Sequence, residues 1–177
     1  MIDVKNFETC ETLKNGTAVT IRAVSPADKE LLVEAFGNLE SETVYTRFFH
    51  HKSHLTDAEL AMATELDFVK DVGLVVTVSG PEREVIIGAA RYSRLPAEQD
   101  GQLAAEVAFT VEEDYQGQGI AGRLLGHLTR IAREQGITSF VAEVLAGNKA
   151  MLGVFKRSGL PLRTTYQDGD IHVALSL

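Results

Sequence analysis

One stretch of the sequence constrains the fold more than any other: a strand-like segment that passes through a glycine-rich turn straight into a long amphipathic helix. The odd-numbered residues of 103–111 are apolar and alternate with small or polar ones, which is the period of a strand with one buried face. From Gly117 onward, apolar residues recur at helical spacing for roughly twenty residues, until Gly136 ends the helix. The fold must therefore accommodate this strand–turn–helix unit.

The segments on either side of this unit complete a mixed pattern. The expected strands are 17–23, 73–78, 85–94, 103–111 and 138–145, followed by two closing strands near the C-terminus. The expected shorter helices are 26–38, 41–49, a third that Thr56 or Asp57 caps and that ends near Leu66, and 148–158. Because no internal repeat or linker interrupts this order, we expect a single mixed α/β (α+β) domain around one central sheet.

Composition excludes several classes of protein. With 177 residues, 45% apolar and 24% charged, the chain matches one globular domain, 1–177, in which 1–15 is a candidate mobile N-terminal segment. It has no apolar run of about 18–20 residues and no secretory signal, so we expect a cytoplasmic protein without a membrane partner. The lone Cys10 excludes a disulfide framework and a Cys-rich zinc site. The net charge of −8 argues against a nucleic-acid partner and suits cationic or small ones.

The glycine-rich turn has the chemistry of an anion-binding loop. Glycines let backbone N–H groups converge on an anion, and the N-terminus of the following helix adds a partial positive charge. The turn lacks the Gly-Lys-Ser/Thr of a Walker loop and the full G-x-G-x-x-G fingerprint of a dinucleotide-binding loop. Tight packing between strand and helix is the structural alternative for these glycines.

The turn and a segment downstream of it carry two motifs. The first is Gln116-x-x-Gly119-x-Ala121, and the second is Asn148-x-x-x-Leu152-x-x-Phe155-x-x-x-Gly159-Leu160. The first resembles the acetyl-CoA-binding motif of the GNAT family of N-acetyltransferases, and the second resembles the penultimate helix of that family. Tyr45-x-Arg47-Phe48-Phe49 and Ala105-Glu106-Val107-Ala108 resemble, more narrowly, the acetyltransferase domain of bacterial protein-lysine acetyltransferases. The resemblance implies a GNAT-like single domain with a mixed, mostly antiparallel sheet flanked by helices.

The resemblance also implies a set of residues that bind acetyl-CoA as co-substrate. Backbone amides of the turn would hold the diphosphate of coenzyme A: Gln116, Gly117, Gln118, Gly119, Ile120 and Ala121. The end of the preceding strand would bond the pantetheine arm as an added strand, through Phe109, Thr110 and Val111. Asn148 would contact the pantetheine or the thioester, although it can equally cap its own helix. Arg123 can reach a phosphate or lie on a solvated helix face.

Direct acetyl transfer needs a neutral amine, and a lysine amine is neutral only about 0.04% of the time at pH 7. A positioned base removes the proton, usually through a water. Glu106 is the candidate base, because a carboxylate on a small-residue strand face is costly unless it is paired or used, and because the resembling subfamily has its catalytic Glu there. The structural alternative is a solvated carboxylate paired with Arg91 or Arg94. Glu143 is the competing carboxylate, for which an exposed or salt-bridged role is expected.

Other side chains carry less information. Many family members have a Tyr as general acid where this chain has Phe155, so we assign no general acid. His50, His51 and His54 have no accompanying third-ligand motif, and we expect no metal. The expected activity is acetyl transfer to a primary amine, on a protein lysine or a small molecule. The alternatives are a non-catalytic acetyl-CoA- or acyl-CoA-binding regulatory module and an unrelated nucleotide-binding protein.

Overall fold

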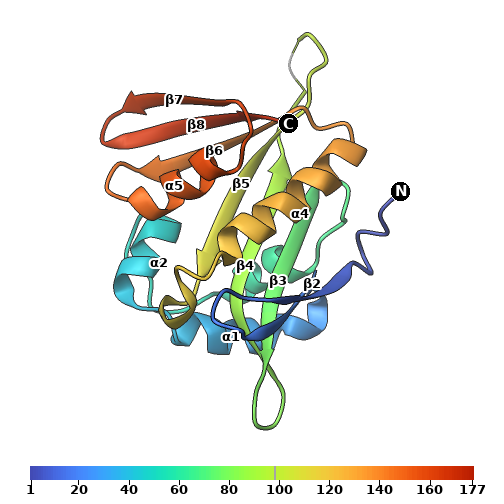
Figure 1. Ribbon diagram of the computed structural model, residues 1–177, viewed down its shortest axis with the longest axis vertical. Coiled ribbons are helices and arrows are strands. Elements are labelled where there is room, and N and C mark those ends of the chain that lie inside the picture. The colour runs from blue at the N-terminus through green and yellow to red at the C-terminus, as the bar shows by residue number, and fades with distance from the viewer. Residues whose placement is uncertain (98) are drawn as a thin grey trace.

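The chain is described by a computed structural model that covers residues 1–97 and 99–177 and is built around one eight-stranded sheet (Figure 1). The strand order is β1-β2-β3-β4-β5-β6-β8-β7, and every neighbouring pair is antiparallel except β5 and β6. The strands are β1 (Glu8–Thr12), β2 (Ala18–Ala23), β3 (Asp71–Ser79), β4 (Glu84–Arg94), β5 (Ala104–Val111), β6 (Ser139–Leu145), β7 (Leu162–Gln167) and β8 (Asp170–Ser176). The predicted mixed, mostly antiparallel sheet is therefore confirmed.

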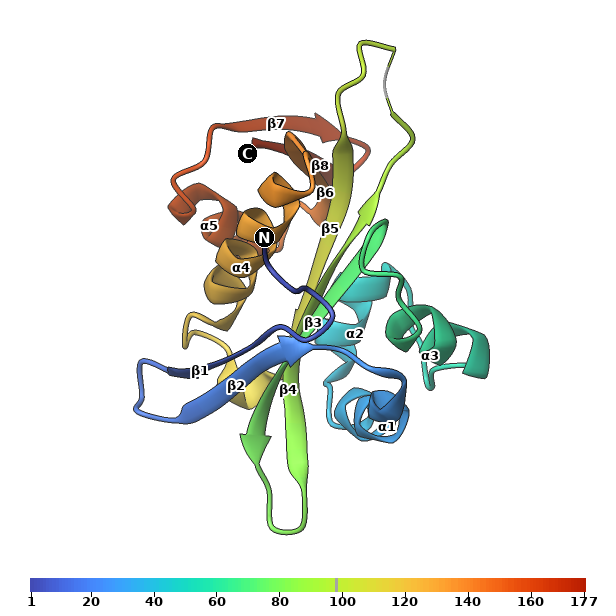
Figure 2. The same ribbon diagram turned by 90° about the vertical axis from the view of Figure 1, so that its right-hand side faces the viewer.

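Helices cover both faces of this sheet (Figure 2). One face carries α4 (Ile120–Glu134) and α5 (Lys149–Arg157), and the other carries α1 (Lys29–Gly37), α2 (Ser41–Phe48) and α3 (Asp57–Thr64). Two short 3-10 turns, η1 (Pro26–Asp28) and η2 (Glu113–Tyr115), precede α1 and α4. The predicted helices are thus all present, each within a few residues of its expected limits.

The main core lies between the sheet and α4. The apolar stripe of α4 is fully buried at Leu124, Leu128 and Ile131, where it packs on β3, β4 and β5. The predicted apolar face of β5 contributes Ala105 and Val107, which are also buried. A smaller core on the opposite face holds Val24, Leu31, Val75 and Ile86, beneath α1. The strand–turn–helix unit is therefore fixed by burial on both sides of the turn.

Strands β5 and β6 pair over a short stretch and then separate. Their parallel register runs from Ala104 opposite Ser139 to Glu106 opposite Val141. Beyond that point β5 continues along β4, whereas β6 follows β8, and Figure 1 shows the two strands diverging. The sheet is thus split in its middle, and the split opens beside the glycine-rich turn.

The segment 1–15 contains a strand that the sequence analysis did not anticipate. Residues Glu8–Thr12 form β1, which pairs with β2 from Glu8 opposite Arg22 to Thr12 opposite Ala18. The strand has no apolar alternation because it is the edge of the sheet, and its residues alternate only between exposed and half-buried.

Of the residues that the structure describes, none belongs to a helix long and apolar enough to cross a membrane.

Candidate active site

A large cleft opens where β5 and β6 separate. It has a volume of about 1830 Å³ and is walled by the ends of β5 and β6, the glycine-rich turn, the first turns of α4 and α5, and α2. A coenzyme and an acceptor can therefore meet in one continuous space.

The end of β5 presents backbone groups to this cleft. The N–H of Glu112 donates to Ile87 O at 2.9 Å, and the N–H of Leu95 donates to Ala104 O at 2.9 Å. Because hydrogen-bonded pairs alternate along an antiparallel ladder, the even-numbered residues of β5 bond to β4. Phe109 and Val111 therefore turn their N–H and C=O groups towards the gap, whereas Thr110 turns its own towards β4. The Val111 carbonyl already accepts a hydrogen bond from the side-chain Nε2 of Gln116 at 3.0 Å.

The glycine-rich turn lines the cleft with backbone N–H groups. Gly117 (φ 75°) and Gly119 (φ 85°) adopt the left-handed conformation, which favours glycine, and Gly119 is the N-cap of α4. Within the described residues, the N–H groups from Gly117 to Gly122 donate to no protein acceptor. A run of unpaired N–H groups at a helix N-terminus is suited to a phosphate or diphosphate.

The turn between β1 and β2 lies against this loop, and the sequence analysis missed its contribution. The N–H of Asn15 donates to Gln118 Oε1 at 3.1 Å. Lys14 also lines the cleft and crosses the loop so closely that a Cβ on Gly119 would lie 3.6 Å from its Cε. Lys14 is thus a cation beside the N–H cradle, from a strand pair that no pattern in the sequence indicated.

Arg123 is half-buried and held by protein partners rather than lying on a solvated helix face. Its guanidinium donates to Glu11 Oε2 at 2.6 Å and to Thr12 O at 2.8 Å, so it ties α4 to β1. His127 contacts the other oxygen of Glu11 at 2.5 Å. Burial opposes the ionisation of Glu11, but the bonds from Arg123 and His127 outweigh it and lower the pKa of that carboxyl.

Glu106 lies at the point where β5 and β6 separate, exposed to the cleft. No hydrogen bond or ion pair joins its carboxylate to any residue that the structure describes. The pairing with Arg91 or Arg94 that was considered as an alternative does not occur. Arg94 donates to Gln135 O at 3.2 Å instead.

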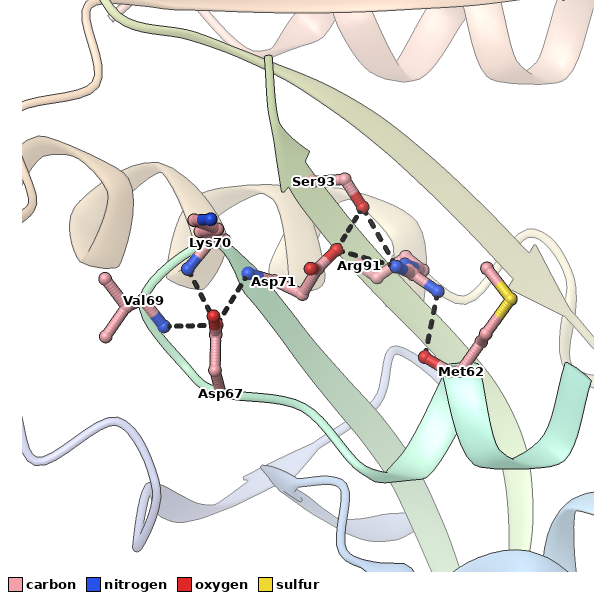
Figure 3. A network of polar contacts seen from close by, with 7 residues as sticks. All are labelled: Met62, Asp67, Val69, Lys70, Asp71, Arg91 and Ser93. Atoms are coloured by element: carbon pink, nitrogen blue, oxygen red, sulfur yellow. Dashed lines mark hydrogen bonds and ion pairs between the residues drawn. The ribbon is translucent and has the colours of Figure 1, made fainter. Parts of the chain in front are cut away.

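Arg91 belongs to a polar network on the neighbouring strands (Figure 3). It donates to Asp71 Oδ1 at 2.8 Å and to Ser93 Oγ at 2.9 Å, while Ser93 donates to Asp71 Oδ1 at 2.5 Å. Ser93 is the cross-strand neighbour of Glu106 on β4. The network therefore borders Glu106 without neutralising it.

Arg47, on the last turn of α2, lines the same part of the cleft as Glu106. Burial lowers the pKa of its guanidinium, Arg91 lowers it further, and the charge of Glu106 acts in the opposite direction. The sequence analysis quoted Arg47 within a motif but gave it no role. A single cation near an apolar helix end carries no signal of its own until the fold places it beside a carboxylate.

Asn148 is the N-cap of α5, and Phe155 lies within the helix. Asn148 Oδ1 accepts from the N–H of Met151 at 3.1 Å, so the capping role is present, and the residue also lines the cleft. Phe155 is buried and packs edge-on against Phe109, with ring centroids 6.1 Å apart. The position at which many relatives carry a Tyr is therefore part of the apolar cleft wall.

An acidic run, Glu112-Glu113-Asp114, precedes the loop. Glu113 Oε1 accepts from the N–H of Glu40 at 2.8 Å, which ties the start of α2 to the loop. Burial, with the charges of Asp114, Glu113 and Glu40, raises the pKa of Glu112. Glu143 is exposed, as expected, and its carboxylate contacts Nδ1 of His172 on β8.

The three neighbouring histidines make only local contacts. His50 Nδ1 contacts His51 O at 3.0 Å, and His54 Nδ1 contacts Ser53 Oγ at 3.1 Å. The described part of the chain brings no three His, Cys, Asp or Glu side chains close enough to hold a metal ion.

Comparison with known proteins agrees with this geometry. The GNAT domain of S. lividans PAT superposes with a TM-score of 0.86 at 34% identity, covering 96% of this chain and 97% of that domain. Acetyltransferase Pat of Mycolicibacterium smegmatis is 36% identical over 149 residues, which are 83% of this chain but 42% of Pat. Acetyltransferase PA5475 of Pseudomonas aeruginosa is 32% identical over 143 residues, 80% of this chain and 74% of that protein.

The chain thus spans less than half the length of the M. smegmatis relative. The model of the acetyltransferase (GNAT) family matches residues 32–160, a span that includes Glu106, the glycine-rich loop and Asn148. The chain belongs to the acetyltransferase (GNAT) family.

Proposed function

We propose that the chain 1–177 is a single acetyltransferase domain that moves the acetyl group of acetyl-CoA to a primary amine, most simply a protein lysine. The observation that carries the proposal is an unpaired carboxylate, Glu106, at the point where the sheet splits beside a loop of unpaired N–H groups. Two relatives, Pat and PA5475, are named acetyltransferases, and this supports acetyl transfer as the reaction class.

The coenzyme would lie along the split in the sheet. Its diphosphate would accept bonds from the amides of Gly117 to Gly122, with Lys14 as a nearby cation. Its pantetheine arm would bond to the backbone of Phe109 and Val111, as an added strand. Asn148 would lie beside that arm, at the N-cap of α5.

Glu106 would act as the general base. It takes a proton from the ammonium group, through a water, and the neutral amine then attacks the thioester carbonyl. The C–N bond forms, the C–S bond breaks, coenzyme A leaves as a thiolate, and the nitrogen loses its second proton to solvent to give the neutral amide. With Phe155 in place of a phenol, the thiolate departs without a protein acid, which a thiol pKa of about 8–9 permits near neutral pH.

The test is the Glu106→Gln variant, assayed for coenzyme A release from acetyl-CoA with a lysine peptide. Loss of a general base should lower kcat by about 10²- to 10³-fold at saturating substrates. The affinity for acetyl-CoA, measured by calorimetry, should stay unchanged because Glu106 does not line the phosphate loop. Glu143→Gln is the matched control, since it removes an exposed carboxylate from the adjacent strand, and it should keep wild-type turnover.

A second candidate function is a non-catalytic acetyl-CoA-binding module, and the burial of Phe155 is the observation that favours it. In that case acetyl-CoA binds, yet no protein or small-molecule amine releases coenzyme A. Unchanged turnover in Glu106→Gln would instead leave the enzyme intact and remove the base assignment.

A further inference from the structure

Arg47 differs from the other arginines of the described chain. The half-buried ones, Arg22, Arg91, Arg94 and Arg123, each donate a hydrogen bond to a carboxylate or a carbonyl. Arg47 is half-buried too, but its guanidinium makes no hydrogen bond or ion pair with any residue that the structure describes. The ring of Phe48 lies beneath it, with the ring centroid 5.0 Å from the guanidinium carbon.

This state is costly in the absence of a ligand. A guanidinium stays charged at any pH that the protein meets, so it cannot escape burial by losing its proton. A buried charge without a partner is unfavourable, and the lowered pKa of Arg47 reflects that cost. Glu106 lies in the same cleft wall but more than 4.0 Å away, beyond ion-pair distance. The five donors of Arg47 are thus available to whatever fills the cleft.

The position of Arg47 determines which ligand can reach it. The phosphate loop and the start of α2 lie together, because Gln116 Nε2 contacts Thr43 Oγ1 at 3.4 Å. Arg47 is one helical turn further along α2, beside Glu106 rather than beside the loop. The group that meets Arg47 therefore belongs to the acceptor and not to the diphosphate of the coenzyme.

We propose that Arg47 recognises a carboxylate on the acceptor, close to the amine that becomes acetylated. The inference rests on the proposed function, which places the acceptor amine at Glu106. A planar guanidinium matches a carboxylate with two parallel hydrogen bonds, which gives orientation as well as affinity. At the other end of α2, Glu40 and Glu42 line the cleft and repel a carboxylate. The acceptor is thus a lysine with an acidic neighbour, held with that neighbour towards the C-terminal end of α2.

The experiment compares matched acceptors in wild type and in Arg47→Gln. One pair of peptides carries Glu or Gln beside a single lysine. A second pair is Nα-acetyl-lysine and its amide, which tests whether the carboxylate is a side chain or a free α-carboxylate. Wild type should prefer the Glu peptide by about tenfold in kcat/KM, through KM, and Arg47→Gln should accept both peptides equally. The affinity for acetyl-CoA should not change.

Two further variants keep the result interpretable. Arg163→Gln removes an arginine from the exposed strand β7, outside the cleft, and should retain the preference. Arg47→Lys keeps the charge but not the paired donors, so its preference should fall between wild type and Arg47→Gln, and it serves if Arg47→Gln does not fold. A preference for the free α-carboxylate would identify a small amino acid as the acceptor while keeping the role of Arg47.

The proposal is overturned if wild type does not distinguish either pair of acceptors, or if Arg47→Gln keeps the wild-type preference. It is also overturned if Arg47→Gln slows both peptides equally and shifts the pH profile, because Arg47 would then position Glu106. Absence of coenzyme A release with every acceptor, despite acetyl-CoA binding, would remove the proposed function and this inference with it.

Discussion

At the scale of single residues, the left-handed conformation of Gly119 gives a direct test of whether the glycine-rich loop binds acetyl-CoA. At φ 85° any side chain strains the backbone, by about 1–2 kcal/mol. Space is not the obstacle, since an added Cβ would meet only side-chain atoms at ordinary contact distances, the Cε of Lys14 at 3.6 Å and the Nε of Arg123 at 4.0 Å. Gly119→Ala should therefore reorient the loop N–H groups so that they no longer converge on one anion. Acetyl-CoA binding should weaken about tenfold, measured by calorimetry.

The control for this change is Gly37→Ala, on α1. Gly37 has an ordinary helical conformation with nothing within 4 Å of an added Cβ, so alanine should raise the free energy of unfolding by about 0.5–1 kcal/mol and leave acetyl-CoA binding unchanged. Equal acetyl-CoA affinity in Gly119→Ala and wild type would mean that the loop holds no diphosphate.

Single residues also show which parts of the candidate site could be predicted from the sequence. Glu106 was identifiable because local alternation put a carboxylate on a face of small residues, and the motif around it was continuous along the chain. Lys14 and Arg47 were not identifiable, because their relevance to the site depends on residues more than fifty positions away in the sequence. Lys14 lies beside Gly119, and Arg47 lies beside Glu106. Charge at a turn or at a helix end has no period that a sequence pattern could detect.

At the scale of elements, the attachment of β1 to α4 depends on one carboxylate. Glu11 bonds Arg123 and His127, and its lowered pKa means that its ionised form stabilises the fold. Glu11→Gln should lower the free energy of unfolding by about 1–2 kcal/mol at pH 7, in urea denaturation. The stabilisation is present above the unfolded pKa of about 4.3 and is lost as pH falls through the lowered folded pKa, so the difference between variant and wild type should shrink as the pH is lowered from 7 to 3.

Glu8→Gln is the matched change on the same strand, at an exposed carboxylate, and it should have no measurable effect at either pH. A constant difference between Glu11→Gln and wild type from pH 7 to pH 3 would contradict the electrostatic account.

Strand β1 was not predicted from the sequence for a related reason. β1 is held by backbone pairing and by this ion pair rather than by burial, so it leaves no hydrophobic signature in the sequence.

At the scale of the whole molecule, the fold is one sheet whose two parts are joined by only a short parallel pairing. Alternating apolar residues predicted the strands, but the split depends on where β6 leaves β5 for β8, which is a property of non-local pairing. Because the proposed coenzyme would fill the split, binding should stabilise the molecule by about 2.7 kcal/mol at one hundred times Kd.

The split makes a residue-resolved prediction for amide hydrogen exchange across the whole chain. The N–H groups of Ala108 and Thr110 already bond to β4, so they should exchange slowly with or without acetyl-CoA. Those of Phe109 and Val111 face the gap and should exchange quickly in the free protein, then slow by tenfold or more once a pantetheine arm pairs with them. Equal slowing of even and odd residues would indicate global stabilisation alone, and the coenzyme would then not lie in the split as an added strand.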